Sequence, residues 1–164
     1  PAYVYSQYFL GRRATALARI DLLNKLSQNF DVTVYTHTDC IDILPTAIYG
    51  GKIDYYDTMP TVFQHSKINL NITLKTIQTG IPLRAWDILG CGGFLLTNFQ
   101  QELCDFFIPG EDFVYYESPA DAIEKAAYFL SHDRDRQEIA HNAFEKIAAS
   151  HTFHHRVQSM FDLI

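Results

Sequence analysis

The chain has 164 residues, the size of a single domain that can bury its own core. Hydrophobic residues make up 48% of it and charged residues 20%, which excludes a disordered chain, and the net charge of −6 excludes broad nucleic-acid binding, which needs Lys and Arg on the phosphates. No apolar run approaches the roughly 18 to 20 residues that cross a bilayer. We therefore expect one cytoplasmic domain over residues 1–164, without a transmembrane segment or a signal peptide.

In the first third of the chain, the spacing of apolar residues predicts a strand, a helix and a second strand. PAYVYSQYFLG predicts a strand at about residues 2–9. Apolar residues then recur at helical spacing between residues 14 and 26, and DVTVYT predicts a second strand over residues 31–36. The next segment, residues 37–60, holds two prolines and a Gly-Gly pair and predicts a long loop with a short extended piece at residues 53–55.

The alternation of helix and strand continues through the middle of the chain. Pro60 predicts the start of a brief helix, and KINLNITL, residues 67–74, predicts a strand with alternate apolar residues. A helix is expected over about residues 82–89, ending at a Gly-Cys-Gly-Gly segment, and the apolar run FLLTN, residues 94–98, predicts a buried strand.

The last third of the chain is mostly helical. QQELCDFF predicts a short helix and FVYYE a strand. Ser118, Pro119 and Asp121 together predict a capped helix start, and two further helices are expected over about residues 133–150 and from Thr152 onward. Strands that alternate with helices indicate a Rossmann-like, doubly wound α/β domain: a parallel sheet with helices on both faces, closed by C-terminal helices.

The stretch GIPLRAWDILGCGG follows a predicted strand, where ligands bind in open parallel sheets. Gly80 permits close approach of a ligand, and a helix starting at Pro82 presents the amides of Leu83, Arg84 and Ala85 to an anion such as phosphate. The Arg84 side chain can bind phosphate through two hydrogen bonds.

Two further residues of this segment suit the same ligand. Asp87, one turn into the helix, can accept hydrogen bonds from both hydroxyls of a ribose. Lys75, at the end of the preceding strand, is a further candidate for the phosphate. The alternative is that Arg84 and Asp87 form an ordinary surface ion pair.

The ordered series KINLNITLKTIQTGIPLRAWDILGCGGFLLTN, ELCDFFIPGEDFVYYESPADAIEKAAYFL and HTFHHR resembles the C-terminal domain of group-1 glycosyltransferases of the GT-B type. It is most similar to the branch of the spore-maturation (CgeB-like) proteins. The resemblance covers roughly residues 50–164, and the first 50 residues are compatible with it. It implies a donor-binding domain for a nucleotide diphosphate sugar, UDP- or GDP-linked, with no metal or other cofactor.

The resemblance also assigns site residues. Relatives carry E-x-F-G-L-x-x-x-E-A-x-x-C-G, whose second acid, on the ribose, falls on Asp87 and whose diphosphate-binding loop falls on Leu83 and Arg84. The first acid, on the sugar, falls on Thr79, so the motif is not matched there.

Three further pairs of residues correspond to contacts in relatives. The pair Arg12 and Arg13 falls where relatives place a basic residue on the diphosphate, although a solvated helix start explains it equally well. The base is met around Ile53 and Tyr55, where ordinary half-buried aromatics are the alternative. The sugar is faced by Asn98 and Glu102, and Glu102 can instead stabilise the start of its own helix.

The resemblance further implies a division of labour between two domains. Such enzymes hold their acceptor site and catalytic base in an N-terminal domain, so we expect this chain to be the donor half of a longer enzyme and to bind donor without turnover. A nucleotide-sugar epimerase of the same architecture and a non-catalytic Rossmann-like ligand-binding module are the alternatives. The histidines of HTFHHR lack HExxH spacing and an acid cluster, so no metal site is expected.

Overall fold

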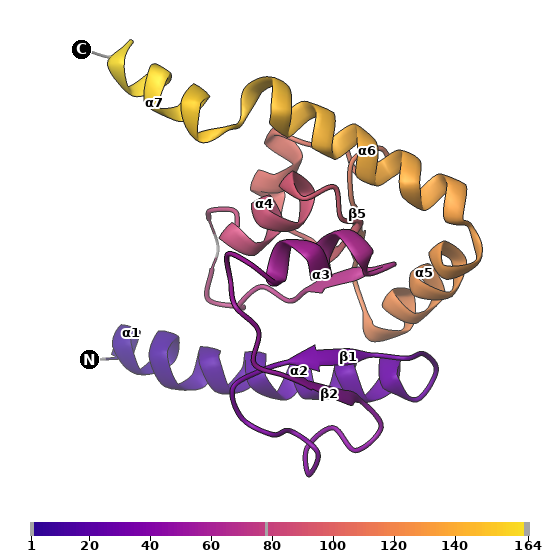
Figure 1. Cartoon of the computed structure of the whole chain (residues 1–164). Coiled ribbons are helices and arrows are strands. Elements are labelled where there is room, and N and C mark those ends of the chain that lie inside the picture. The colour runs from indigo at the N-terminus through magenta and orange to yellow at the C-terminus, as the bar shows by residue number, and fades with distance from the viewer. Residues whose placement is uncertain (1, 78, 163–164) are drawn as a thin grey trace.

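The computed structural model describes residues 2–77 and 79–162 and has the mixed α/β architecture expected from the sequence (Figure 1). Two parallel sheets are present, and helices flank them. One sheet pairs β1 (Thr33–Tyr35) with β2 (Ile48–Gly51), and the other has the order β3 (Asn69–Asn71), β4 (Leu95–Asn98), β5 (Val114–Tyr116). The three-stranded sheet and the two-stranded sheet are separate hydrogen-bonded units.

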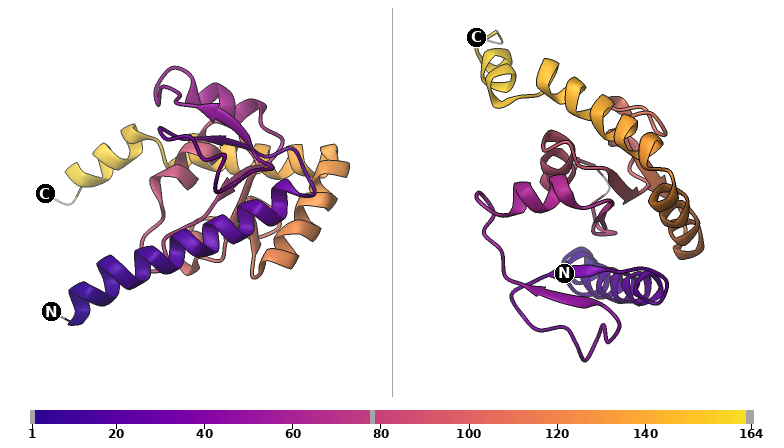
Figure 2. Two further views of the ribbon diagram at one scale, coloured as in Figure 1. Left: turned by 90° about the horizontal axis from the view of Figure 1, so that it is seen from below. Right: turned by 45° about the vertical axis from the view of Figure 1, so that its right-hand side comes forward.

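The chain begins as a long helix and not as a strand. The segments α1 (Ala2–Val4), the π-helical η1 (Tyr5–Gly11) and α2 (Arg12–Ser27) follow one another without a break (Figure 2, left). The prediction of a strand over residues 2–9 is therefore wrong. A helix pairs its backbone groups internally, whereas a strand needs a neighbour.

The second element placed wrongly is the extended piece at residues 53–55. The strand of this region is β2, which lies earlier, inside the segment expected to be a loop, and pairs in parallel with β1 from Thr33↔Ile48 onward. The predicted strands over residues 31–36, 67–74, 94–98 and 113–117 are confirmed as β1, β3, β4 and β5, each shorter than its apolar run.

The remaining helices agree with the sequence-based expectations. Their bounds are α3 (Met59–His65), α4 (Leu83–Gly90), the 3₁₀ helix η2 (Gln101–Asp105), α5 (Pro119–Ser131), α6 (Asp133–Ser150) and α7 (Phe153–Phe161). Thr152 caps α7 as expected, because its hydroxyl accepts a hydrogen bond from the His155 amide.

Helices cover both faces of the three-stranded sheet. Leu96 of β4 is buried against α2 and α5, whereas its neighbour Leu95 is buried against α3, α4 and η2. α6 runs across both layers (Figure 1), since Ile139 joins the first cluster and Ala143 the second. Alternation along one strand thus gives a sheet with two buried faces, as the doubly wound class requires.

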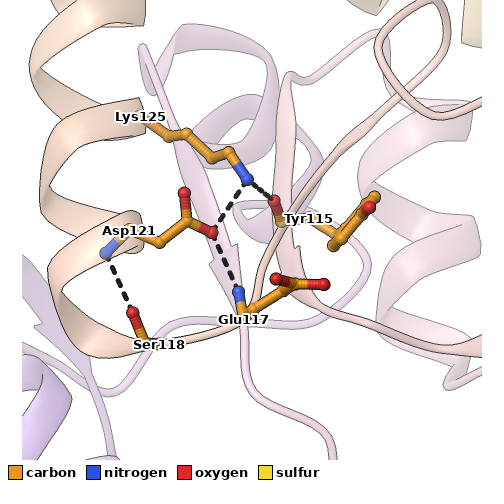
Figure 3. Close-up of polar contacts among 5 residues, drawn as sticks. All are labelled: Tyr115, Glu117, Ser118, Asp121 and Lys125. Carbon is orange, nitrogen blue, oxygen red and sulfur yellow. Dashed lines mark hydrogen bonds and ion pairs between the residues drawn. The ribbon is translucent and has the colours of Figure 1, made fainter.

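The start of α5 is held by a small polar network (Figure 3). Ser118 Oγ accepts a hydrogen bond from the Asp121 amide at 3.2 Å, and Asp121 Oδ2 accepts one from the Glu117 amide at 2.9 Å. Lys125 Nζ donates to the same carboxylate at 2.8 Å and to the carbonyl of Tyr115, in β5, at 2.7 Å. The network therefore ties the helix start to the end of β5.

We expect Asp121→Asn to destabilise the fold by about 1 kcal/mol at pH 7. Burial raises the pKa of Asp121, but the hydrogen bonds from Lys125 and the Glu117 amide outweigh it and lower the pKa overall. A lowered pKa means that the stabilisation is present above the unfolded pKa and is lost as the pH falls, so the difference should shrink between about pH 4 and pH 2. Urea unfolding at pH 7 and pH 3 measures this, with the exposed Glu124→Gln of the same helix as control; an equal difference at both pH values contradicts it.

Candidate functional site

The predicted site lies where β3 and β4 end and the chain turns toward α4. Asn98, the last residue of β4, accepts a hydrogen bond on Oδ1 from the Thr73 amide at 2.8 Å. Beneath it, Asn71 Nδ2 donates to Thr97 Oγ1 at 3.0 Å and to Thr73 Oγ1 at 3.1 Å. Buried polar side chains thus fix the path of the chain as it leaves β3. Asn98 lies at this edge of the sheet, as expected.

The connection that follows β3 rests on α2. The Lys75 amide donates to Thr15 Oγ1 at 3.0 Å, and that hydroxyl donates to the Gly11 carbonyl at 2.8 Å. A Cβ at Gly11 would overlap Thr76 Cγ2, so the connection packs closely against this glycine. The Lys75 side chain is exposed beside the loop.

The two arginines that follow Gly11 stand on a helix. Arg12 and Arg13 are exposed in the first turn of α2, and the Arg12 guanidinium lies 5.2 Å from the centre of the Tyr8 ring. Their expected position after a first strand is therefore wrong, because residues 2–11 are helical. They remain near the connection through Gly11, which contacts Thr76.

The start of α4 is the segment where an anion-binding site is predicted. Gly80 has φ +93°, which favours glycine, and Pro82 is the N-cap without a capping side chain. Leu83 and Arg84 begin the helix and are exposed, Leu83 by 77%. The Ala85 amide donates to the Pro82 carbonyl at 2.9 Å, so the expectation that this amide is free is wrong. The amides of Leu83 and Arg84 precede that first turn.

Glu102 reaches this segment from η2. Its carboxylate accepts a hydrogen bond from the Gly80 amide, which brings together two predicted site residues that are 22 positions apart. Thr79, the neighbour of Gly80, is exposed. In this structure the Glu102 carboxylate thus contacts the loop before α4, which was not predicted.

Asp87 forms its hydrogen bond with a residue from a distant loop. The Tyr55 hydroxyl donates to Asp87 Oδ2 at 2.6 Å, and this bond, with burial and the Asp87 charge, raises the pKa of Tyr55, while Arg84 nearby lowers it. In the described parts of the chain, Arg84 and Asp87 are not within salt-bridge distance, so the simple ion pair is not the arrangement observed.

The loop that carries Tyr55 is held by Asp54. Asp54 Oδ1 accepts hydrogen bonds from the amides of Asp57 and Tyr56, both at 2.8 Å, and these bonds lower the pKa of Asp54. The Asp54 carbonyl accepts from the Met59 amide at 2.9 Å, which joins the turn to α3. Ile53 is half-buried just before this turn. An Asp that precedes two turn residues is the sequence signal that identifies such a loop.

A second group of residues near α4 was not predicted. Trp86 lies edge-on to Phe106 and Phe107 and 5.3 Å from the His151 ring, and the Arg156 guanidinium lies 5.5 Å from the Trp86 ring centre. Burial, and then the charge of Arg156, lower the pKa of His151. The cluster attaches the junction of α6 and α7 to α4. The single Trp of the chain is the only sequence signal that pointed to it.

Two surface hollows are lined by residues other than the predicted site residues. One, of about 320 Å³, is lined by residues such as Glu111, Tyr128 and Asn142, and the other, of about 490 Å³, lies between Lys25 and Pro119. Among residues 2–77 and 79–162, no three His, Cys, Asp or Glu side chains are grouped as metal ligands would be. In the same residues, no helix is long and apolar enough to cross a membrane.

A protein-family model described as "Glycosyl transferase-like" matches residues 13–162, nearly the whole chain. No curated protein matches the sequence. The family model thus includes the loop after β3, all of α4, η2 and the Tyr55 turn.

Proposed function

The chain belongs to the glycosyl transferase-like family, and from this we propose that it is the donor-binding domain of a GT-B type glycosyltransferase, of the CgeB-like branch, that acts on UDP- or GDP-linked sugars. The observation that carries the proposal is the arrangement of Gly80, Arg84 and Asp87 along the loop and helix that follow β3, in a chain of this family. The family match gives no support to the epimerase or to the non-catalytic module.

In this proposal the diphosphate lies at the start of α4. The amides of Leu83 and Arg84 and the positive end of the helix dipole face it, and the Arg84 side chain forms two charge-assisted hydrogen bonds. Lys75, Arg12 and Arg13 add positive charge from the neighbouring loop and from α2. These groups stabilise the negative charge that builds on the leaving diphosphate, so that no metal ion is required.

The remaining parts of the donor then have defined neighbours. The ribose hydroxyls donate to Asp87, and the base lies along the turn that contains Ile53 and Tyr55. The transferred sugar extends from the diphosphate toward the end of β4. In that direction lie Thr79, Asn98 and Glu102.

The acceptor and the catalytic base are proposed to belong to a further, N-terminal domain of a cytoplasmic enzyme. Large apolar side chains are exposed on two helices that extend from the same side of the molecule (Figures 1 and 2). They are Tyr3, Tyr5, Tyr8, Phe9 and Leu10 on the first helix and Phe153, Val157, Met160 and Phe161 on α7. They form two separate apolar surfaces, because the first helix lies at the bottom of Figure 1 and α7 at the top. Exposed apolar surfaces often mark protein contacts, and we propose that the further domain covers them. This chain alone is therefore expected to bind donor without transferring sugar.

A thermal-shift screen against UDP, GDP and their sugars tests the proposal. A ligand at 100 times its Kd stabilises the folded protein by about 2.7 kcal/mol, which raises the melting temperature of a chain this size by roughly 5 to 10 °C. We expect this rise with UDP or GDP and a smaller rise after Asp87→Ala, which removes the ribose contact. A melting temperature that none of these ligands changes contradicts the proposal.

A further inference from the structure

Asp87, proposed to bind the ribose, and Gly80, in the loop proposed to approach the diphosphate, already have protein partners. Asp87 Oδ2 accepts a hydrogen bond from the Tyr55 hydroxyl at 2.6 Å. The Gly80 amide donates to the Glu102 carboxylate. Both partners come from other elements, Tyr55 from the loop between β2 and α3 and Glu102 from η2.

Each partner has the chemistry of the ligand group expected at the same place. A phenol and a ribose hydroxyl are both neutral O–H donors to a carboxylate. A carboxylate and a diphosphate are both anions that accept hydrogen bonds from backbone amides. Tyr55 thus offers Asp87 the same kind of donor as the pentose, and Glu102 offers the Gly80 amide the same kind of acceptor as the phosphate.

We propose that Tyr55 and Glu102 close the site of the free domain, and that a nucleoside diphosphate must displace both side chains to bind. This inference rests on the function proposed above and deepens it, because it assigns a separate competitor to each part of the ligand. Tyr55 competes with the ribose for Asp87. Glu102 competes with the diphosphate for the Gly80 amide and also repels its negative charge.

The surroundings of both residues allow them to move without opening the core. Tyr55 is 45% exposed, and its turn is held by the hydrogen bonds that the Asp54 carboxylate accepts from the Tyr56 and Asp57 amides, so the Tyr55 side chain can leave while the turn stays in place. Glu102 is half-buried on a five-residue 3₁₀ helix, which is anchored through the buried Leu103. Displacement therefore costs the two hydrogen bonds and little packing.

The contributions of Tyr55 and Glu102 can be measured separately, because pyrophosphate contains only one part of the nucleoside diphosphate. Inorganic pyrophosphate has no ribose, so it competes with Glu102 but not with Tyr55. UDP and GDP compete with both. Tyr55→Phe removes only the hydroxyl and keeps the ring beside the base, and Glu102→Gln removes the charge at nearly constant size.

Isothermal titration calorimetry with UDP, GDP and inorganic pyrophosphate tests the proposal. The relevant nucleotide is whichever of UDP and GDP the unaltered protein binds. We expect Tyr55→Phe to bind this nucleotide roughly three- to tenfold more tightly than the unaltered protein does, which is the effect of one hydrogen bond. Its affinity for pyrophosphate should be unchanged. Glu102→Gln should bind both that nucleotide and pyrophosphate more tightly. Tyr56→Phe, 84% exposed beside Tyr55, and Asp105→Asn, exposed on η2, are the matched controls and should match the unaltered protein.

The outcomes distinguish this inference from the proposed function. If the unaltered protein binds UDP or GDP and either variant binds no more tightly, the competing role of that residue is overturned while donor binding stands. If Tyr55→Phe changes pyrophosphate binding as much as UDP or GDP binding, the separate assignment is overturned. If neither the unaltered protein nor the two variants bind a nucleotide, and the variants keep the melting temperature of the unaltered protein, both proposals are overturned.

Discussion

Arg84→Ala is expected to weaken binding of UDP or GDP by about 10- to 100-fold, the effect of losing charge-assisted hydrogen bonds to phosphate. Arg84 is exposed in the first turn of α4 and forms no salt bridge among the described residues, so its loss should leave the fold intact. Calorimetric titration of the folded variant measures the effect.

The geometry of the guanidinium gives this experiment a graded control. Arg84→Lys keeps the charge but loses the paired hydrogen bonds, so its affinity should fall between those of the unaltered protein and Arg84→Ala. Arg134→Ala, an exposed arginine of α6, should bind as the unaltered protein does. If Arg84→Ala binds UDP or GDP as tightly as the unaltered protein does, the diphosphate does not bind at Arg84.

Gly93→Ala is expected to destabilise the fold by about 3 kcal/mol, the upper range for overpacking a core. A Cβ at Gly93 would lie 2.7 Å from the Phe63 carbonyl oxygen and 2.7 Å from Asn69 Nδ2. These two atoms are hydrogen-bonded to each other at 2.8 Å, so the methyl group would enter the contact that joins α3 to β3. Backbone atoms cannot move aside as the end of a side chain can.

Urea unfolding measures this effect, and the same glycine-rich segment contains the control. A Cβ at Gly90 would meet only Ile147 Cγ2, at an ordinary 3.8 Å. Gly90→Ala should therefore leave stability unchanged or raise it by up to about 1 kcal/mol, because Gly90 lies in α4. If Gly93→Ala and Gly90→Ala are equally stable, the prediction is contradicted, because the close packing at Gly93 then does not exclude a methyl group.

The helices were predictable because their signals are local. Ser118 and Thr152 lie directly before their helices and cap them through their own side chains. Pro119 fixes the first turn of α5 in the same way. The buried strands β4 and β5 were recognised from short apolar runs between turn signals, which depend little on distant residues.

The failures arose where distant residues decide the structure. The aromatic residues between Tyr3 and Phe9 suit a strand, but a strand forms only beside a partner, and this segment continues the helix of α2. For β2 the local sequence argues against a strand, since Ile48–Gly51 contains two glycines. It forms a strand because β1 lies alongside. The expectation that Arg12 and Arg13 follow a strand is wrong for the same reason, because the residues before them are helical.

Part of the proposed site is continuous in the chain. Gly80, Arg84 and Asp87 occupy one loop and one helix, so their order alone places them together. The contacts of Tyr55 with Asp87 and of Glu102 with Gly80 join segments 32 and 22 residues apart. Family resemblance placed these residues in the site, but only the folded structure shows that they bind to each other.

The way α7 is attached has a mechanical consequence. None of its residues is buried, and Phe153 is 91% exposed, but Arg156 in its first turns rests on the Trp86 ring. The helix α7 is therefore held near its N-terminal end, where Arg156 contacts Trp86 of α4. Trp86 lies between Arg84 and Asp87 in sequence, so a tilt of α7 would act, through Arg156 and Trp86, on the same short helix that carries both residues.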